Sequence, residues 1–310
     1  MSTPVVDTVE PAEPAETPAG NGKKQKDSDA GSGKGGLFTY VALAIIVFLW
    51  VVPTIGIALS SFRSRDDARA GGWWHLFTDP ATIANLTFDN YQEAIQGTNL
   101  GEGFVNSLAI ALPATFIPIL IAAFAAYAFT FMKFWGRDIL FIIVVGMLVV
   151  PNFVSFVPML RIYRDMGIGG TFPAVWLFHV GFGMSLAIYM LRNYMSTLPM
   201  TIIESAKIDG ASHFQTFWRL VLPMSVPALA SFAIFQFLWV WNDLLVALVF
   251  LGPGDKAPMT VSISQLLGQQ GQNQELVTAS GMFSMIVPII VFLSLQRFFV
   301  RGLTAGAVKG

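Results

Sequence analysis

Two ionisable side chains, His179 and Asp243, lie within long apolar stretches of this chain. An ionisable group is costly to bury in such surroundings, so each is a functional candidate by default. Asp243 also shares a helical face with Gln236 and Trp239, at positions i, i+3 and i+7. An indole packs on the apolar C–H face of a sugar ring, while an amide and a carboxylate hydrogen-bond its hydroxyl groups. The pattern therefore predicts a surface suited to a carbohydrate.

Other site chemistries find little support in the residue types. The chain has no cysteine, which excludes disulfides and thiolate chemistry, and its three histidines, at 75, 179 and 213, have no metal-ligand spacing. We find no GxSxG elbow, no His/Glu metal motif and no pair of membrane carboxylates. The glycine-rich run 31–36 lacks Ser or Thr after its lysine and follows no strand, so it is interpreted as a linker. Neither an enzyme nor a metal-binding or cofactor-binding chain is expected.

The elements that must position these residues follow from composition. Of 310 residues, 54% are hydrophobic and only 12% are charged, about half the usual charged share, which predicts an all-α integral membrane protein. Residues 1–36 are polar and predict a disordered tail. The remainder contains six apolar segments, each long enough to cross a hydrocarbon core of about 30 Å as a helix. The six predicted transmembrane helices are 37–62, 104–132, 139–160, 171–191, 224–251 and 280–300.

The distribution of lysine and arginine predicts the orientation of these spans. With the N-terminus inside, the inner side carries twelve of these residues and the outer side six. Both termini are then cytoplasmic, and the longer loops 63–103 and 252–279 are external. Trp73 and Trp74 in the first of these loops are interpreted as an aromatic belt at the membrane interface. Interior prolines in the spans predict kinked helices.

Three polar residues fall at one predicted depth. Asn152, His179 and Asp243 each lie eight residues from the outer end of their segments, ~12 Å at the helical rise. Together with Gln236, Trp239 and Asn242, Asn152 and Asp243 form the predicted substrate path. Other interpretations stay open: Asp243 and Asn242 could bridge helices or cap a kink, and the tryptophan and histidine could be packing residues. Asn152 could bond carbonyl groups that the preceding proline frees.

The cytoplasmic stretch 192–223 is built to fold outside lipid. Thr201–Glu204 follows Pro199 as a predicted capping box, and Asp209–Gly210 supplies a helix stop. Ser212–Gln215 predicts a second capping box at once. The stretch therefore predicts two short helices joined by a tight turn. We expect them to present the following apolar residues to a protein partner: Ile202, Ile203, Ile208, Phe214 and Phe217.

This stretch resembles the EAA loop of the membrane subunits of ABC importers. The resemblance rests on Glu204-Ser205-Ala206, then Gly210, and after nine residues Leu220-Val221-Leu222-Pro223; Ser205 stands where alanine is usual. Asn106-Ser107, Trp241-Asn242-Asp243 and the C-terminal run 296–310 are similar to the MalG-like branch of carbohydrate importers. Within it, Arg192-Asn193-Tyr194 and the run 227–237 resemble α-glucoside permeases. The run 278–282 departs from that sub-branch.

The resemblance implies a type I ABC importer permease of the MetI-like fold in a bacterial inner membrane. The EAA loop, taken as 196–223, would couple to a cytoplasmic ATPase dimer, where ATP-Mg is bound and hydrolysed. A homologous second permease subunit, an extracytoplasmic sugar-binding protein and a sugar, an α-glucoside such as a maltose-like or trehalose-like oligosaccharide, complete the expected partners; nucleic acid is not one. The implied coupling residues are Glu204, Ser205, Ala206, Asp209, Gly210, Leu222 and Pro223, and the implied C-terminal ATPase contacts are Gly306, Lys309 and Gly310.

The alternative function is an ion-driven secondary transporter of sugar. Such a protein is expected to have internal repeats and several membrane carboxylates. Asp243 is the one carboxylate within the predicted spans, apart from residues at their ends. The sequence therefore favours the ATP-driven importer.

Overall fold

The structure, a computed structural model, describes residues 34–266 and 273–304, with side chains described in 36–266 and 273–298. Within these ranges the chain is helical and contains no strand. Residues 1–33 of the predicted tail lie outside the described residues, and the first helix begins at Lys34, ahead of the predicted boundary at residue 36.

Four helices are long and apolar enough to cross a membrane, and two bent helix pairs raise the number to six if each pair is one span. The uninterrupted helices are α1 (Lys34–Ser60), α6 (Leu100–Phe131), α9 (Phe172–Met195) and α16 (Gln274–Thr304). They correspond to the predicted segments 37–62, 104–132, 171–191 and 280–300. Pro53, Pro113, Pro118 and Pro288 lie inside α1, α6 and α16 without interrupting them, as expected for prolines in membrane helices, and Pro173 lies in the first turn of α9.

The predicted span 139–160 is not one helix, which corrects the sequence-based expectation. It consists of α7 (Arg137–Gly146), the 3-10 turns η1 (Met147–Val149) and η2 (Asn152–Ser155), and α8 (Phe156–Asp165), with a bend of 94°. Pro151 has no N–H and restricts the residue before it to extended backbone, and Val150 has φ −70° and ψ 119°. The helix therefore ends there.

The predicted span 224–251 is also divided. Its parts are α12 (Leu222–Met224), α13 (Val226–Trp241) and α14 (Leu245–Phe250). The stretch His213–Met224 meets α13 at 71°. A second break separates α13 from α14, because the side chains of Asn242 and Asp243 take up backbone groups of the two helices, as described below.

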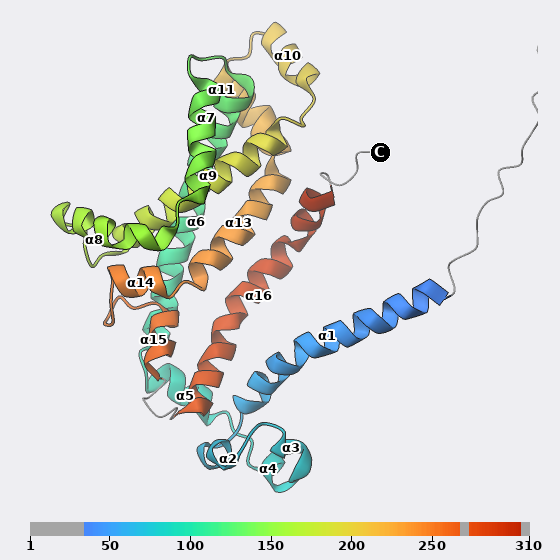
Figure 1. The fold of residues 1–310 in the computed structure, drawn as a ribbon, viewed down its shortest axis with the longest axis vertical. Helices are drawn as coiled ribbons and strands as arrows, with labels where there is room; N and C mark the ends of the chain where they lie inside the picture. The colour runs from blue at the N-terminus through green and yellow to red at the C-terminus, as the bar shows by residue number, and fades with distance from the viewer. Residues whose placement is uncertain (1–33, 267–272, 305–310) are drawn as a thin grey trace, which may run out of the picture. The chain divides into compact units, whose positions relative to one another are not determined.

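In the part of the chain from Pro53 onward, α6 packs on α9 and α13, and α16 packs along α13 (Figure 1). One core joins α6, α9, α13 and α14, and a second core joins the other ends of α6, α9 and α13 to the short helices of the predicted cytoplasmic stretch. We call these the outer core and the inner core, after the predicted orientation. The short helices are α10 (Met200–Ile208), α11 (His213–Thr216) and the π-helical turn η3 (Phe217–Val221).

Short helices form the predicted external loops. The first loop contains α2 (Arg65–Ala70), α3 (His75–Thr78), α4 (Ala81–Ala84) and α5 (Asp89–Gln96), and the second contains α15 (Met259–Leu266). Asn106 on α6 donates to the backbone oxygens of Asp255 and Ala257, and the Ser107 hydroxyl accepts from the Met259 N–H. The Asn106-Ser107 pair therefore fastens the second loop to α6.

Candidate functional site

The predicted stop after α10 is a complete Schellman motif. The Ala211 N–H donates to the Ala206 oxygen at 2.9 Å, and the Gly210 N–H donates to the Lys207 oxygen at 3.1 Å. Gly210 has φ +78°, a left-handed conformation that is strained for residues with a Cβ. The turn after α10 is therefore fixed by local backbone geometry, as the Asp209–Gly210 pair predicts.

The second predicted capping box is confirmed, and the first is wrong. The Ser212 hydroxyl accepts from the Gln215 N–H, while the Gln215 side chain accepts from the Ser212 N–H. Helix α10 instead begins after Pro199, whose extended backbone serves as the N-cap without a side-chain bond. Thr201 consequently lies within the first turn of α10 and not ahead of it.

The two short helices divide their apolar residues between the core and the surface. Ile203 and Phe217 are buried in the inner core, which corrects the expectation that they face a partner. Ala206 is buried as well, whereas Glu204, Ser205, Asp209 and Gly210 are exposed. The exposed apolar residues of this region are Met200, Ile202, Ile208, Phe214 and Trp218. We refer to this set, with Glu204 and Asp209, as the coupling face.

Glu204 is available for an external contact. Its carboxylate makes no hydrogen bond or ion pair with any of the described residues, so it is not a capping group. Leu222 is half-buried and Pro223 is exposed at the start of α12. Gly306, Lys309 and Gly310, the predicted C-terminal contacts, lie outside the described residues.

Aromatic side chains fasten α11 and η3 to the inner half of α6. The Phe217 ring stacks on Phe124 with centroids 4.5 Å apart, and it meets Tyr127 edge-on at 5.4 Å. The Tyr127 hydroxyl hydrogen-bonds His213 Nδ1 at 2.9 Å. These contacts join the short helices directly to α6, one of the helices long enough to span a membrane. The role of Tyr127 was not predicted from the sequence, because no local pattern indicates a partner 86 residues away.

Gln236 joins three helices. Its side chain is 2% exposed, and its amide donates to the backbone oxygen of Ala114 at 3.0 Å and to that of His179 at 3.4 Å. A Cβ added at Gly183 would lie 2.5 Å from the Gln236 oxygen, so the close approach of α9 to α13 depends on that glycine. Gln236 thus holds α6, α9 and α13 together while one edge of it reaches the cavity described next.

Three of the predicted path residues line one cavity. Asn152, Gln236 and Trp239 face a cavity of about 200 Å³ together with Gly183 and apolar side chains of η1 and α9. Trp239 is partly exposed, and the Asn152 side-chain amide makes no hydrogen bond with any described residue. The cavity therefore offers the aromatic face and free amide that a polyhydroxylated ligand requires.

His179 and Asp243 meet beside this cavity. His179 Nε2 lies 3.9 Å from Asp243 Oδ2, and the imidazole meets the Trp239 ring edge-on at 5.3 Å. His179 is 1% exposed, and neither ring nitrogen hydrogen-bonds any described residue. It packs against neighbours as the packing interpretation expects, but its polar atoms are not satisfied by them.

Two further path residues cap the broken helix. The Asp243 carboxylate accepts from the Ala247 N–H at 3.1 Å, and the Asn242 amide donates to the Leu238 oxygen at 2.8 Å. Short polar side chains compete with backbone groups in this way and interrupt helices. The i, i+3, i+7 face predicted from Gln236 to Asp243 therefore ends at Trp241, although Trp239 and Asp243 both approach His179.

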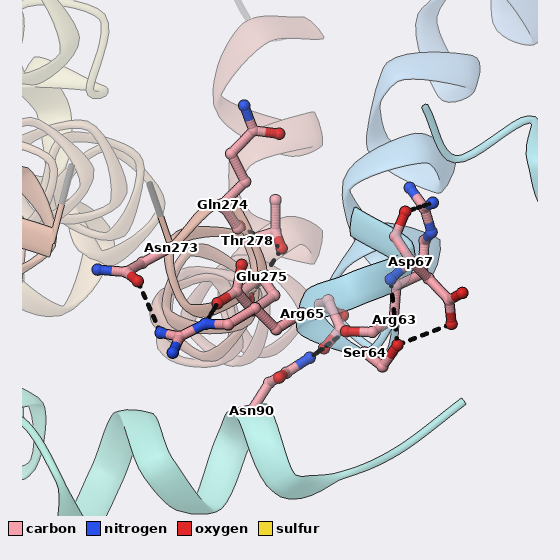
Figure 2. Close-up of polar contacts among 10 residues, drawn as sticks. Arg63, Ser64, Arg65, Asp67, Asn90, Asn273, Gln274, Glu275 and Thr278 are labelled. Atoms are coloured by element: carbon pink, nitrogen blue, oxygen red, sulfur yellow. Dashed lines mark hydrogen bonds and ion pairs between the residues drawn. The ribbon is translucent and has the colours of Figure 1, made fainter. Parts of the chain in front are cut away.

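A polar network in the first external loop was not predicted. Arg65 donates to Glu275 Oε1 at 2.8 Å and to Asn273 Oδ1 at 2.7 Å, which links α2 to the start of α16 (Figure 2). The bond to the Glu275 carboxylate raises the pKa of the Arg65 guanidinium above its ordinary value. Asn90 on α5 donates to the Arg63 oxygen at 2.8 Å. The two partners of Arg65 are 208 and 210 residues away, beyond any local pattern.

Comparison with known proteins adds an independent line of information. Residues 118–305 match the family described as binding-protein-dependent transport system inner membrane component. The osmoprotective compounds uptake permease GgtD of Synechocystis is 52% identical, over 87% of this chain and 91% of its own length. The α-glucoside transport permease AglG of Rhizobium meliloti is also 52% identical, over 81% and 68% respectively. The trehalose transport permease SugB of Mycobacterium tuberculosis is 34% identical, over 74% and 84%.

Solved structures share the fold. A chain of a bacterial ABC transporter that imports the acidic polysaccharide alginate has a TM-score of 0.70, covering 86% of this chain and 96% of that one. The sequence identity between the two is 20%, so the likeness concerns the fold alone. The described helices therefore have the arrangement of an ABC importer permease of the MetI-like type.

Proposed function

The chain belongs to the family of inner membrane components of binding-protein-dependent transport systems, and we propose that it is one permease subunit of an ATP-driven α-glucoside importer. The family consists of transport subunits and not of enzymes, and ATP is hydrolysed elsewhere in the assembly. In the proposed topology each bent pair is one span, giving six, and both termini are cytoplasmic. A homologous second permease subunit closes the other half of the path.

The coupling face is the proposed binding site for the partner ATPase. Two exposed carboxylates, on Glu204 and Asp209, lie among the exposed apolar residues of α10 and α11, next to a turn fixed by Gly210. An exposed apolar patch with a charged rim is typical of a protein interface. The ATPase dimer of the importer would bind this face. Binding and hydrolysis of ATP-Mg in that dimer would then move the face. The C-terminal residues Gly306, Lys309 and Gly310 are proposed as a second contact with that dimer.

The cavity beside α13 is the proposed part of the sugar path that this subunit contributes. Trp239 supplies an apolar face, Asn152 an unpaired amide, and Asp243 with His179 a polar pair at its margin. Asn242, which is exposed at the end of α13, lies at the same helix break. A single subunit leaves the cavity open, so the second permease subunit is needed to enclose a sugar. An extracytoplasmic binding protein would deliver it.

The relatives support the substrate class. AglG is named for α-glucosides and SugB for trehalose, which is itself an α-linked glucoside. GgtD is named for osmoprotective compounds, a description that gives no chemical class. We therefore propose a compact α-glucoside and not a long polysaccharide.

Reconstitution tests the function directly. The subunit, co-expressed with its second permease subunit and ATPase, is placed in proteoliposomes with the cognate binding protein and either trehalose, maltose or the β-linked cellobiose. We expect ATP hydrolysis and uptake to rise with an α-glucoside and not with cellobiose, and uptake to persist when ionophores dissipate ion gradients. Uptake that requires an ion gradient and not ATP would contradict the proposal and favour the secondary transporter.

A further inference from the structure

The first external loop carries a group of exposed apolar side chains that the transport function does not use. Trp74, Phe77 and Ile83 are 56%, 74% and 56% exposed on and beside α3 and α4, and Phe88 is 74% exposed just before α5. We refer to these four residues as the loop patch. Between Trp73 and Leu86 the sequence has one formally charged residue, Asp79. A soluble loop rarely exposes this much apolar surface without a partner.

Two contacts fix the position of the loop patch along the axis of α1, near the end of that helix. The Trp73 indole packs directly on Gly56, since a Cβ added there would lie 2.6 Å from Trp73 Nε1. At the other end of the patch, the Thr87 N–H donates to the Phe62 oxygen at 2.7 Å, and the Phe62 and Phe88 rings are 5.1 Å apart. The patch is therefore tied to Gly56 near the end of α1 and to Phe62 just after it.

This position along α1 corresponds to a membrane interface. α1 ends at Ser60, and Gly56 lies four residues further in, ~6 Å at the helical rise. If Ser60 marks the level of the lipid headgroups, Trp73 and its neighbours lie at the boundary with the acyl chains. The rings of Trp73, Trp74 and Phe77 form one cluster there, with centroids 6.1 to 6.3 Å apart. Indole and phenyl side chains are enriched at this depth.

We propose that the loop patch is immersed in the outer leaflet, so that α3 and α4 form a monotopic anchor beside the first span. The occupant of this surface is phospholipid. The alternative, a soluble protein partner, fits less well, because the patch is nearly free of charge and is tied to residues 56 and 62 at the end of the proposed first span. This inference rests on the proposed function in one respect, the use of α1 as a span whose outer end is Ser60.

Site-directed spin labelling tests the anchor. This chain has no cysteine, so each introduced cysteine is unique in it, and the subunit is labelled before it is assembled with its partners. Phe77→Cys is compared with Gln92→Cys, an exposed position on α5, in the complete transporter in phospholipid vesicles. Both side chains are exposed, so neither substitution removes a core contact. We expect the nitroxide at 77 to collide more often with oxygen than with a water-soluble nickel chelate, and the nitroxide at 92 to show the reverse order.

Two results at position 77 would overturn the inference. Preferential collision with the nickel chelate would place the patch in water, and protection from both reagents would place it against protein. A separate measurement tests the side of the membrane on which the loop lies, independently of its immersion in lipid. Gln92→Cys should react with a membrane-impermeant maleimide added outside intact cells. Failure of that reaction would contradict the proposed topology, whereas an external position 92 with an aqueous position 77 would contradict the anchor alone.

Discussion

The Nε2 atom of His179 and the Oδ2 atom of Asp243 lie 3.9 Å apart, and they join α9 to the break between α13 and α14. The contact is longer than a hydrogen bond, so a small movement of either helix is enough to form or abolish one. Asp243 is held in place by the Ala247 N–H and by the Thr260 hydroxyl, which donates to the Asp243 backbone oxygen at 2.6 Å. His179 is therefore the partner with unused hydrogen-bonding capacity.

Asp243→Asn is expected to reduce sugar-stimulated ATP hydrolysis by roughly tenfold. The amide oxygen can still accept from Ala247, so the helix cap survives, while the charge that faces His179 and the cavity is lost. A hydrogen bond from a sugar hydroxyl to this charged carboxylate would contribute about 1.5 to 3 kcal/mol, and its weakening in the amide is consistent with that factor. The measurement is ATPase activity in proteoliposomes with binding protein and sugar. Asp165→Asn, at an exposed carboxylate at the end of α8, serves as a control; normal activity of Asp243→Asn would favour a capping role alone.

Gly210→Val is expected to abolish uptake while leaving the subunit in the membrane. A β-branched residue at φ +78° is strained by ~1–2 kcal/mol, and the Schellman turn that orients the coupling face would open. Gly136→Val is the matched control, because Gly136 has φ +76° and, like Gly210, open space around an added Cβ. Uptake and co-purification of the ATPase are measured for both. Equal loss in the two variants would mean that backbone strain, and not the coupling turn, is responsible.

Gly183→Ala is expected to destabilise the helix packing by about 1–3 kcal/mol, the usual cost of overpacking. The added methyl group would displace the Gln236 amide from the Ala114 and His179 oxygens and would occupy part of the cavity that both residues line. Gly181→Ala lies on the same helix with nothing within 4 Å of the new Cβ, so it should not destabilise the protein, because alanine favours a helix more than glycine does. Thermal unfolding of the purified subunit in detergent distinguishes them. The same melting temperature for both variants would contradict the packing role assigned to Gly183.

Tyr127→Phe is expected to weaken coupling without disrupting the aromatic packing. The variant loses the bond to His213 Nδ1, worth about 0.5 to 1.5 kcal/mol, but keeps the ring against Phe217. The quantity to measure is sugar transported per ATP hydrolysed, which we expect to fall. Tyr163→Phe removes one hydroxyl from a buried tyrosine of the outer core and should not change the ratio. An unchanged ratio in Tyr127→Phe would mean that the hydroxyl takes no part in coupling transport to ATP hydrolysis.

Local signals in the sequence predict the features that short stretches of chain determine. Gly210 and the Ser212–Gln215 box specify backbone turns within a few residues, and both are present. The orientation of Ile203 and Phe217 is different, because α10 and η3 turn those side chains toward α6 and α9, which lie far away in sequence. Apolar residues at a helix surface look alike whether they face a core or a partner.

The helix breaks show a second limit. Apolar length alone makes 139–160 and 224–251 resemble continuous spans, and prolines elsewhere are accommodated within helices α1, α6 and α16. The backbone gives way where a proline coincides with a turn of 3-10 helix, and where Asn242 and Asp243 both bond backbone groups. Such coincidences depend on side-chain conformation, which residue spacing does not specify.

The 71° angle between His213–Met224 and α13 has a mechanical consequence. A displacement of the arm His213–Met224 along its own axis would act on α13 mostly perpendicular to the axis of α13, with Ser225 as the pivot. The helix that lines the cavity would then swing about its inner end, as a lever does, and would not slide through the bilayer. A small displacement of the arm would thereby become a larger sideways movement at Trp239, which lies fourteen residues beyond Ser225.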